Sequence, residues 1–193
     1  MKRLLTVIVV VLVVAWCLLV LLSWLLSAMM VEGVRSLLSG EGVRWFFAHF
    51  ADGLASPLLV WLLLAAMAGG CLHRSGLIAS SAAFHRGTGL RVAVLLVLLY
   101  VAAIVLLVAP PHALLLSATG TLAHSPFSRA LVPLVCFGVV LGSVAYGVTL
   151  RRFTSLTDII DALIHGLRAA APLLFLYVLA TQLLQSVFFV FYS

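Results

Sequence analysis

The residues best suited to chemistry lie in an apolar run near the end of the sequence. Thr181, Gln182, Gln185 and Ser186 interrupt residues 169–193, which are otherwise uncharged and mostly hydrophobic. Residues three and four positions apart share one face of a helix, so the two glutamines and Ser186 are predicted to project together. Because an amide left unpaired in hydrocarbon is costly, this face is predicted to meet protein or water.

Two uses of this polar face remain open. It could supply hydrogen bonds between helices, each worth roughly 0.6–2 kcal/mol in a membrane. It could instead line a pathway for a substrate or an ion. The run 130–150 offers the same choice, because Gly138 and Gly142 would allow close helix packing or a bend, and Ser143 and Tyr146 add hydroxyl groups nearby.

Support in the sequence for a metal site, a phosphate site or a catalytic site is weak. Asp158, Asp161 and His165 share one face of a predicted amphipathic helix over 156–168, and they are residue types that bind metals. The two acids also suit the start of a helix, for example as a capping box of Thr157 with Asp161, so no metal site is predicted. No phosphate-binding loop and no motif that pairs a nucleophile with a base is found, so neither an enzyme nor a cofactor is expected.

The elements that must position these residues are five long apolar runs. The chain has 193 residues, of which 65% are hydrophobic and 8% are charged. A helix needs roughly 20 residues to cross about 30 Å of hydrocarbon, and helices satisfy their own backbone groups there. The sequence therefore predicts an all-α polytopic membrane protein, with 1–193 as a single integral membrane domain. The predicted spans are 4–31, 53–72, 92–111, 130–150 and 169–193.

The charges between the runs predict an orientation. If the N-terminus is inside, the inner segments carry eight Lys and Arg residues and the outer segments carry three. This positive-inside bias predicts an N-in, C-out topology. The net charge of +6 is then explained by the position of the membrane, and no nucleic-acid partner is expected.

Three connecting segments are predicted to lie at the membrane surface. Residues 32–52 place aromatic side chains beside charges, which is typical of an interfacial aromatic belt. A re-entrant or substrate-facing segment is the alternative. The connection 112–128 is apolar, and it is predicted either to lie against the membrane or to form a shallow re-entrant turn. The amphipathic helix over 156–168 is predicted to precede the last span.

Three collinear blocks of this chain resemble the p-aminobenzoyl-glutamate transporter (AbgT) family. The first block comprises 36–46, 56–58 and 74–78, and it resembles the family's first outer loop and second helix. The second, 125–147, resembles a mid-chain helix. The third, 157–182, resembles an inner helix and the span that follows it.

The resemblance implies a secondary transporter of aromatic, amide-linked carboxylates in a bacterial cytoplasmic (inner) membrane. It also implies re-entrant hairpins, which have no counterpart between Ile78 and Arg91 or after Gln182. We therefore expect a second copy or a partner chain to complete the cavity; the alternative is a membrane scaffold or subunit that does not transport. If the chain transports, Gln182 and Gln185 are expected to line the pathway, with Tyr146 and Ser143 facing them.

Overall fold

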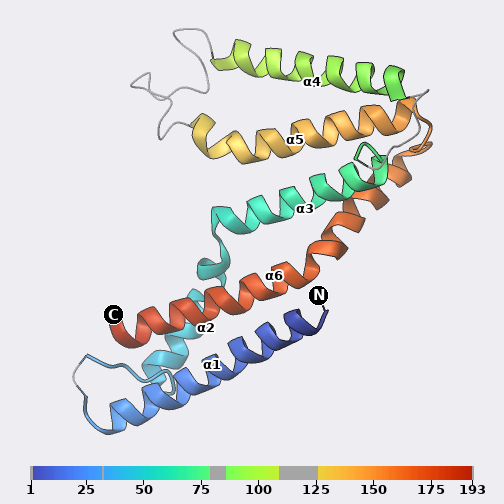
Figure 1. The fold of residues 1–193 in the computed structure, drawn as a ribbon. Helices are drawn as coiled ribbons and strands as arrows, with labels where there is room; N and C mark the ends of the chain where they lie inside the picture. Colours follow the sequence, from blue (N-terminus) through green and yellow to red (C-terminus); the bar gives the residue numbers. More distant parts are fainter. Residues whose placement is uncertain (1, 32, 79–85, 109–125, 193) are drawn as a thin grey trace. The chain divides into compact units, whose positions relative to one another are not determined.

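The computed structural model describes residues 2–31, 33–78, 86–108 and 126–192. All regular structure in these residues is helical (Figure 1). Five helices of the described part of the chain are long and apolar enough to cross a membrane, which confirms the predicted fold class. The helices are α1 (Lys2–Ala28), α2 (Gly40–Leu54), α3 (Pro57–Ser75), α4 (Arg86–Val108), α5 (Pro126–Thr149) and α6 (Leu156–Tyr192).

The five predicted spans correspond to α1, α3, α4, α5 and α6, with shifts at their ends. The predicted connection 112–128 lies almost entirely outside the described residues. The remaining helix, α2, begins within the segment 32–52 that was predicted to be interfacial and ends two residues after it, at Leu54. Its start is capped by Ser39, whose Oγ accepts a hydrogen bond from the backbone N–H of Gly42 at 3.0 Å.

Helix α6 differs from the prediction because it is one continuous helix of 37 residues. The amphipathic segment and the last span were expected to be separate elements. Ala169, Ala170 and Ala171 are strong helix formers, so the helix continues through this junction and contains Pro172 in its interior. At 1.5 Å per residue it is about 55 Å long, well beyond the ~30 Å of a bilayer's hydrocarbon.

The start of α6 is capped by a different pair from the one predicted. The Ser155 Oγ accepts from the Asp158 backbone N–H at 3.3 Å, and the Asp158 carboxylate accepts from the Ser155 backbone N–H at 3.0 Å. This is the reciprocal geometry of a capping box, which requires a spacing of three residues. Thr157 and Asp161 are four residues apart, and the pairing predicted for them is wrong.

The chain divides into two compact units, which we describe separately. Unit 1 contains residues 1–60 and 171–193, and unit 2 contains residues 61–170. Helices α3 and α6 contribute to both units. The prediction of a single membrane domain stays a prediction.

Unit 1 is built around a small hydrophobic core. Leu19, Leu37, Phe189 and Val190 are buried there, and the Trp45 ring stacks on Phe189 with centroids 4.3 Å apart. Helices α1 and α2 and the end of α6 therefore pack on a common core.

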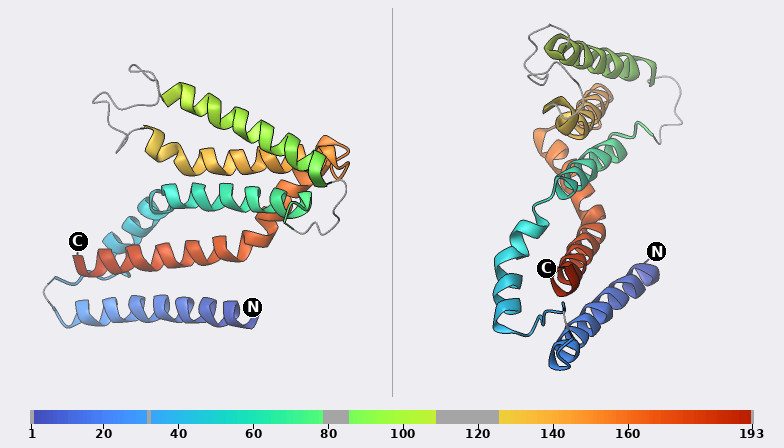
Figure 2. Two further views of the ribbon diagram at one scale, coloured as in Figure 1. Left: turned by 45° about the horizontal axis from the view of Figure 1, so that its top comes forward. Right: turned by 90° about the vertical axis from the view of Figure 1, so that its left-hand side faces the viewer.

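Unit 2 contains the start of α6, the C-terminal part of α3, and the pair α4 and α5. Helices α4 and α5 lie side by side in both views of Figure 2 and have many contacts. A second core consists of Cys71, Phe153 and Ala162, all buried. Large side chains such as Leu95 and Leu99 remain exposed on α4, as a membrane-spanning helix requires.

Helices α3 and α6 approach each other closely in unit 2. A Cβ on Gly166 would collide with the carbonyl oxygen of Ala66, and a Cβ on Gly70 would collide with the backbone of Gly166. Only glycine leaves room for two backbones at this separation. The contact positions the start of α6 against α3.

Candidate functional site

Gln182 lies at the centre of a polar surface within unit 1. Its side chain is 8% exposed, and its Nε2 group donates a hydrogen bond to the backbone carbonyl of Phe50 at 3.2 Å. Phe50 lies near the C-terminal end of α2, where the helix dipole is negative and favours an N–H donor. The polar face predicted from the sequence therefore meets protein, as expected for an amide in an apolar helix.

Gln185 lies one turn further along α6, against the last turn of α2. Its amide is so close to Gly53 that a Cβ at that position would collide with both Oε1 and Nε2. The side chain is half-buried. Gly53 therefore creates the space that the Gln185 amide occupies.

Two further polar contacts extend this surface along α6. The Ser186 hydroxyl is fully buried and accepts from Trp16 Nε1 of α1 at 3.4 Å. The Tyr177 and Ser56 hydroxyl oxygens are 2.6 Å apart, and Ser56 lies in the break between α2 and α3. We call Tyr177, Gln182, Gln185 and Ser186 the polar seam of α6.

Sequence reasoning missed the partners of the polar seam and one of its four members. The partners Trp16, Phe50, Gly53 and Ser56 are distant in sequence from α6, so no spacing rule connects them to it. Tyr177 was missed although a signal existed. It lies four residues before Thr181, whose Oγ1 donates to the Tyr177 carbonyl at 2.8 Å, and the i, i+4 spacing could have extended the polar face by one turn.

The other two predicted site residues, Ser143 and Tyr146, belong to unit 2. Both side chains are 1% exposed. Among the residues that the structure describes, neither hydroxyl has a hydrogen-bond partner. Gln182 and Gln185 belong to unit 1, so the prediction that the two pairs face each other stays a prediction.

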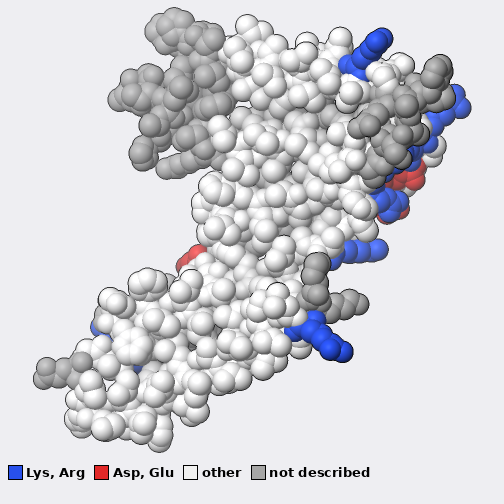
Figure 3. All heavy atoms as spheres, viewed as in Figure 1, with Lys and Arg blue, Asp and Glu red and all other residues white. Residues whose placement is uncertain are grey.

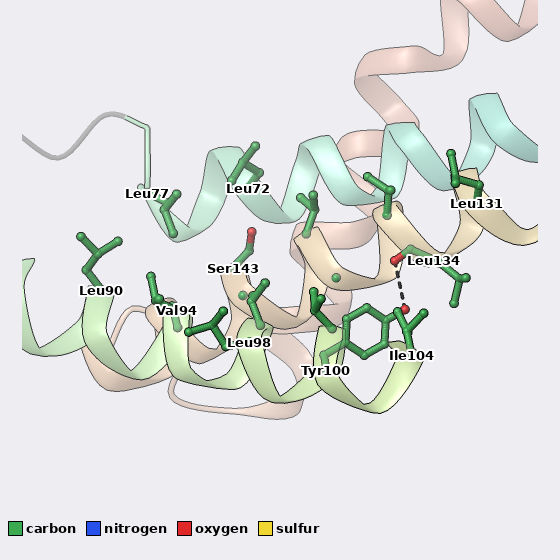
Figure 4. A pocket seen from close by; sticks show the side chains of 17 residues that line it. Leu72, Leu77, Leu90, Val94, Leu98, Tyr100, Ile104, Leu131, Leu134 and Ser143 are labelled. Atoms are coloured by element: carbon green, nitrogen blue, oxygen red, sulfur yellow. Dashed lines mark hydrogen bonds between the residues drawn. The ribbon is translucent and has the colours of Figure 1, made fainter. Parts of the chain in front are cut away.

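Ser143 lines an elongated cavity of about 610 Å³ in unit 2, between α3, α4 and α5. In Figure 4 the lining side chains extend from Leu77 and Leu90 at one end to Ile104 and Leu131 at the other. The lining is almost entirely aliphatic. The Tyr100 hydroxyl, also in the lining, donates to the Leu134 carbonyl at 3.0 Å, so the unpaired Ser143 hydroxyl is the free polar group of the described wall.

On the face of α6 that carries Asp158, Asp161 and His165, the last two are exposed and Asp158 is partly buried. The His165 ring stacks on His73 of α3 with centroids 5.9 Å apart. The Asp158 carboxylate is engaged by the capping interactions and by the backbone N–H and hydroxyl of Thr154. In the described part of the chain, no three His, Cys, Asp or Glu side chains are grouped so as to hold a metal ion.

Gly53→Ala tests whether the position of the Gln185 amide matters. The new methyl group would displace a flexible side-chain end and not backbone, and alanine favours the helix by about 1 kcal/mol. We therefore expect a melting temperature close to that of the wild type, and reduced uptake if the amide contacts the substrate. Uptake and thermal stability are measured on the same preparation. A large loss of stability would contradict this description of the contact.

Tyr146→Phe removes a buried hydroxyl that has no partner. An unsatisfied buried polar group costs about 1–3 kcal/mol, so the variant is expected to be as stable as the wild type or more stable by roughly 1 kcal/mol. Thermal unfolding followed by circular dichroism measures this. Tyr100→Phe is the matched control, because its hydroxyl has a partner and the same change should destabilise the protein. The opposite order of stability would contradict the prediction.

Comparisons with known proteins agree with the resemblance. A search of curated proteins found no match, and a search of solved structures found none either. A model of the AbgT putative transporter family matches residues 80–190, more than half of the chain. The match includes the second and third blocks that resemble the family, and all four predicted site residues. The chain belongs to the AbgT putative transporter family.

Proposed function

We propose that the protein is a secondary transporter, or a component of one, for p-aminobenzoyl-glutamate-like aromatic carboxylates. The polar seam of α6 is the observation that carries this proposal within the family. Two amides and two hydroxyls lie on the membrane-spanning part of an apolar helix, beside the break between α2 and α3. In many transporters, substrates and ions bind where spanning helices are interrupted.

The side chains of unit 1 suit such a substrate chemically. An amide N–H can donate to a carboxylate, and an amide carbonyl can accept from an aryl amine. Aromatic rings line the neighbouring surface: Trp16 and Phe46 have centroids 5.9 Å apart, and Phe46 and Phe50 have centroids 5.6 Å apart. Aromatic pairs attract further rings in offset or edge-on arrangements. Gln185 is the side chain we assign to substrate contact, because Gln182 is already bonded to Phe50.

A second copy or a partner chain is part of the proposal. The connection between Ile78 and Arg91 is about a dozen residues long, whereas the resemblance implies a long segment with a re-entrant hairpin there. Transporters built from inverted repeats form their substrate sites from such interrupted segments. A neighbouring chain would supply them.

Uptake by the purified chain in proteoliposomes tests the proposal. The vesicles are given a sodium or proton gradient and labelled p-aminobenzoyl-glutamate outside. We expect accumulation that depends on the gradient. A full-length family member serves as the positive control, and absence of both uptake and binding for this chain in the same assay would overturn the proposal.

The alternative function is a membrane scaffold or subunit that does not transport. It is favoured by one observation: the Gln182 amide and the Ser186 hydroxyl already have partners within unit 1. Hydrogen bonds between helices are sufficient to explain such residues. On this alternative, changes in the polar seam alter assembly or stability, and no ligand shifts the melting temperature.

A further inference from the structure

The cavity of unit 2 has the shape and chemistry of a binding site for a hydrocarbon chain. It extends along α4 from Leu90 to Ile104, which corresponds to about 21 Å at 1.5 Å per residue. One leaflet of a bilayer contributes about 15 Å of hydrocarbon. A long, aliphatic cavity of this length matches an extended acyl chain better than a compact polar solute.

Small residues form part of the cavity wall. Gly138 and Gly142 of α5 line the cavity, and a Cβ on Gly142 would lie 2.9 Å from a methyl carbon of Val97. Ala93 lines it from α4 and is nearly fully buried. Larger residues at Gly138 and Gly142 would press on Tyr100 and Val97 of α4, so the shape of the cavity depends on these small residues.

One end of the cavity lies beside a group of arginines. Arg91 follows Leu90 directly in α4, and Leu90 lines the cavity. The Arg152 guanidinium packs on Gly76, which precedes the lining residue Leu77. Figure 3 shows basic side chains over the end of unit 2 where α4 begins and α5 ends.

These arginines are available to an anionic group. Arg91 and Arg152 are exposed. In the described residues the ion pair is between Arg35 and Glu41, so neither cation has a carboxylate within 4 Å. Of the acids at this end of unit 2, Asp158 is engaged by Thr154 and Ser155. The exposed Asp161 is the remaining acidic side chain there.

We propose that unit 2 binds an anionic phospholipid of the bilayer at this place. One acyl chain lies in the cavity between α4 and α5, and the phosphate headgroup contacts Arg91 and Arg152. Basic groups between spanning helices bind lipid phosphates in this way, and each arginine near the surface contributes about five-fold in affinity. The site shares no residue with the polar seam of α6.

Lipid retention measured by native mass spectrometry tests the proposal. The purified chain is titrated with dioleoyl phosphatidylglycerol or with dioleoyl phosphatidylcholine, which has the same acyl chains. We expect the wild type to prefer phosphatidylglycerol. The double variant Arg91→Gln with Arg152→Gln is expected to lose roughly 30-fold in affinity for phosphatidylglycerol and little for phosphatidylcholine.

Two matched controls distinguish binding at this site from non-specific attraction of anionic lipid to a positively charged protein. Arg3→Gln with Arg44→Gln removes the same net charge from exposed arginines of unit 1 and should leave the preference unchanged. Val94→Trp enlarges a cavity-lining residue that is 49% exposed, and it should weaken the binding of both lipids. Leu95→Trp enlarges a residue that is 67% exposed and outside the lining, and it should not.

Three outcomes would overturn the proposal. The first is equal binding of the two lipids by the wild type. The second is an equal loss of phosphatidylglycerol binding in the two double arginine variants. The third is unchanged lipid binding in Val94→Trp. The arginine variants alter exposed side chains, so the headgroup test remains decisive if the tryptophan variant fails to fold.

Discussion

Gly166→Ala is expected to lower the free energy of unfolding by about 3 kcal/mol, the upper end of what overpacking a well-packed contact costs. The added methyl group would collide with the Ala66 carbonyl oxygen and the Gly70 backbone nitrogen. Both obstacles are backbone atoms of α3, so no side chain can move aside. Thermal unfolding and size-exclusion chromatography of the variant in detergent measure the effect.

Gly69→Ala is the control for this substitution. Gly69 also lies in α3, but a Cβ there would meet nothing within 4 Å. The change should be neutral or stabilising by up to about 1 kcal/mol, because alanine favours a helix over glycine. If Gly166→Ala and Gly69→Ala unfold at the same temperature, the close approach of α3 and α6 is wrong.

The largest functional effect is expected from Gln182→Leu combined with Gln185→Leu. Leucine suits the apolar surroundings, and the lost hydrogen bond to Phe50 is worth about 1 kcal/mol, so the protein should remain folded. If the polar seam binds substrate, uptake of p-aminobenzoyl-glutamate should fall at least about ten-fold, which corresponds to about 1.4 kcal/mol. Flux and melting temperature are measured in parallel.

The control for the glutamine variant is Thr181→Val. The Thr181 hydroxyl bonds to the backbone carbonyl of Tyr177 in its own helix, so its removal should leave uptake intact. A further prediction separates the two proposed functions. A ligand-dependent rise in melting temperature that disappears in the glutamine variant supports transport, whereas a change in assembly without any ligand effect supports the scaffold.

The spans were predictable because hydropathy is a local property of the sequence. Charged residues interrupt the apolar runs, and the ends of α1, α3 and α5 lie within a few residues of those interruptions. The continuity of α6 was harder to see, since Pro172 and the change from amphipathic to apolar pattern suggested a boundary. The three alanines before Pro172 favour helix strongly, and α6 continues through this position. The cap at Ser155 could also have been predicted from the sequence, because Asp158 follows Ser155 at the spacing of three residues that a capping box requires.

For the polar seam, the α6 glutamines could be predicted from the sequence, but the residues that they contact could not. Gln182 and Gln185 are conspicuous within an apolar run. Their partners are determined by tertiary packing, and no local sequence pattern predicts them. Gly53 illustrates the difficulty: in the sequence it is an ordinary glycine near a helix end, and in the structure it holds the space for the Gln185 amide. The close contact between Gly70 and Gly166 could not be predicted from the sequence either, because the two residues lie on different helices and no local spacing relates them.

The proline within α6 divides that helix into two mechanical segments. Pro172 has no backbone N–H, so the carbonyl four residues earlier lacks its helical partner, and the ring crowds that carbonyl. A continuous α-helix transmits bending along its whole length, whereas a proline concentrates bending at one turn. The segment 156–171 and the polar seam beyond it are therefore joined by the turn at which bending of α6 is expected to concentrate.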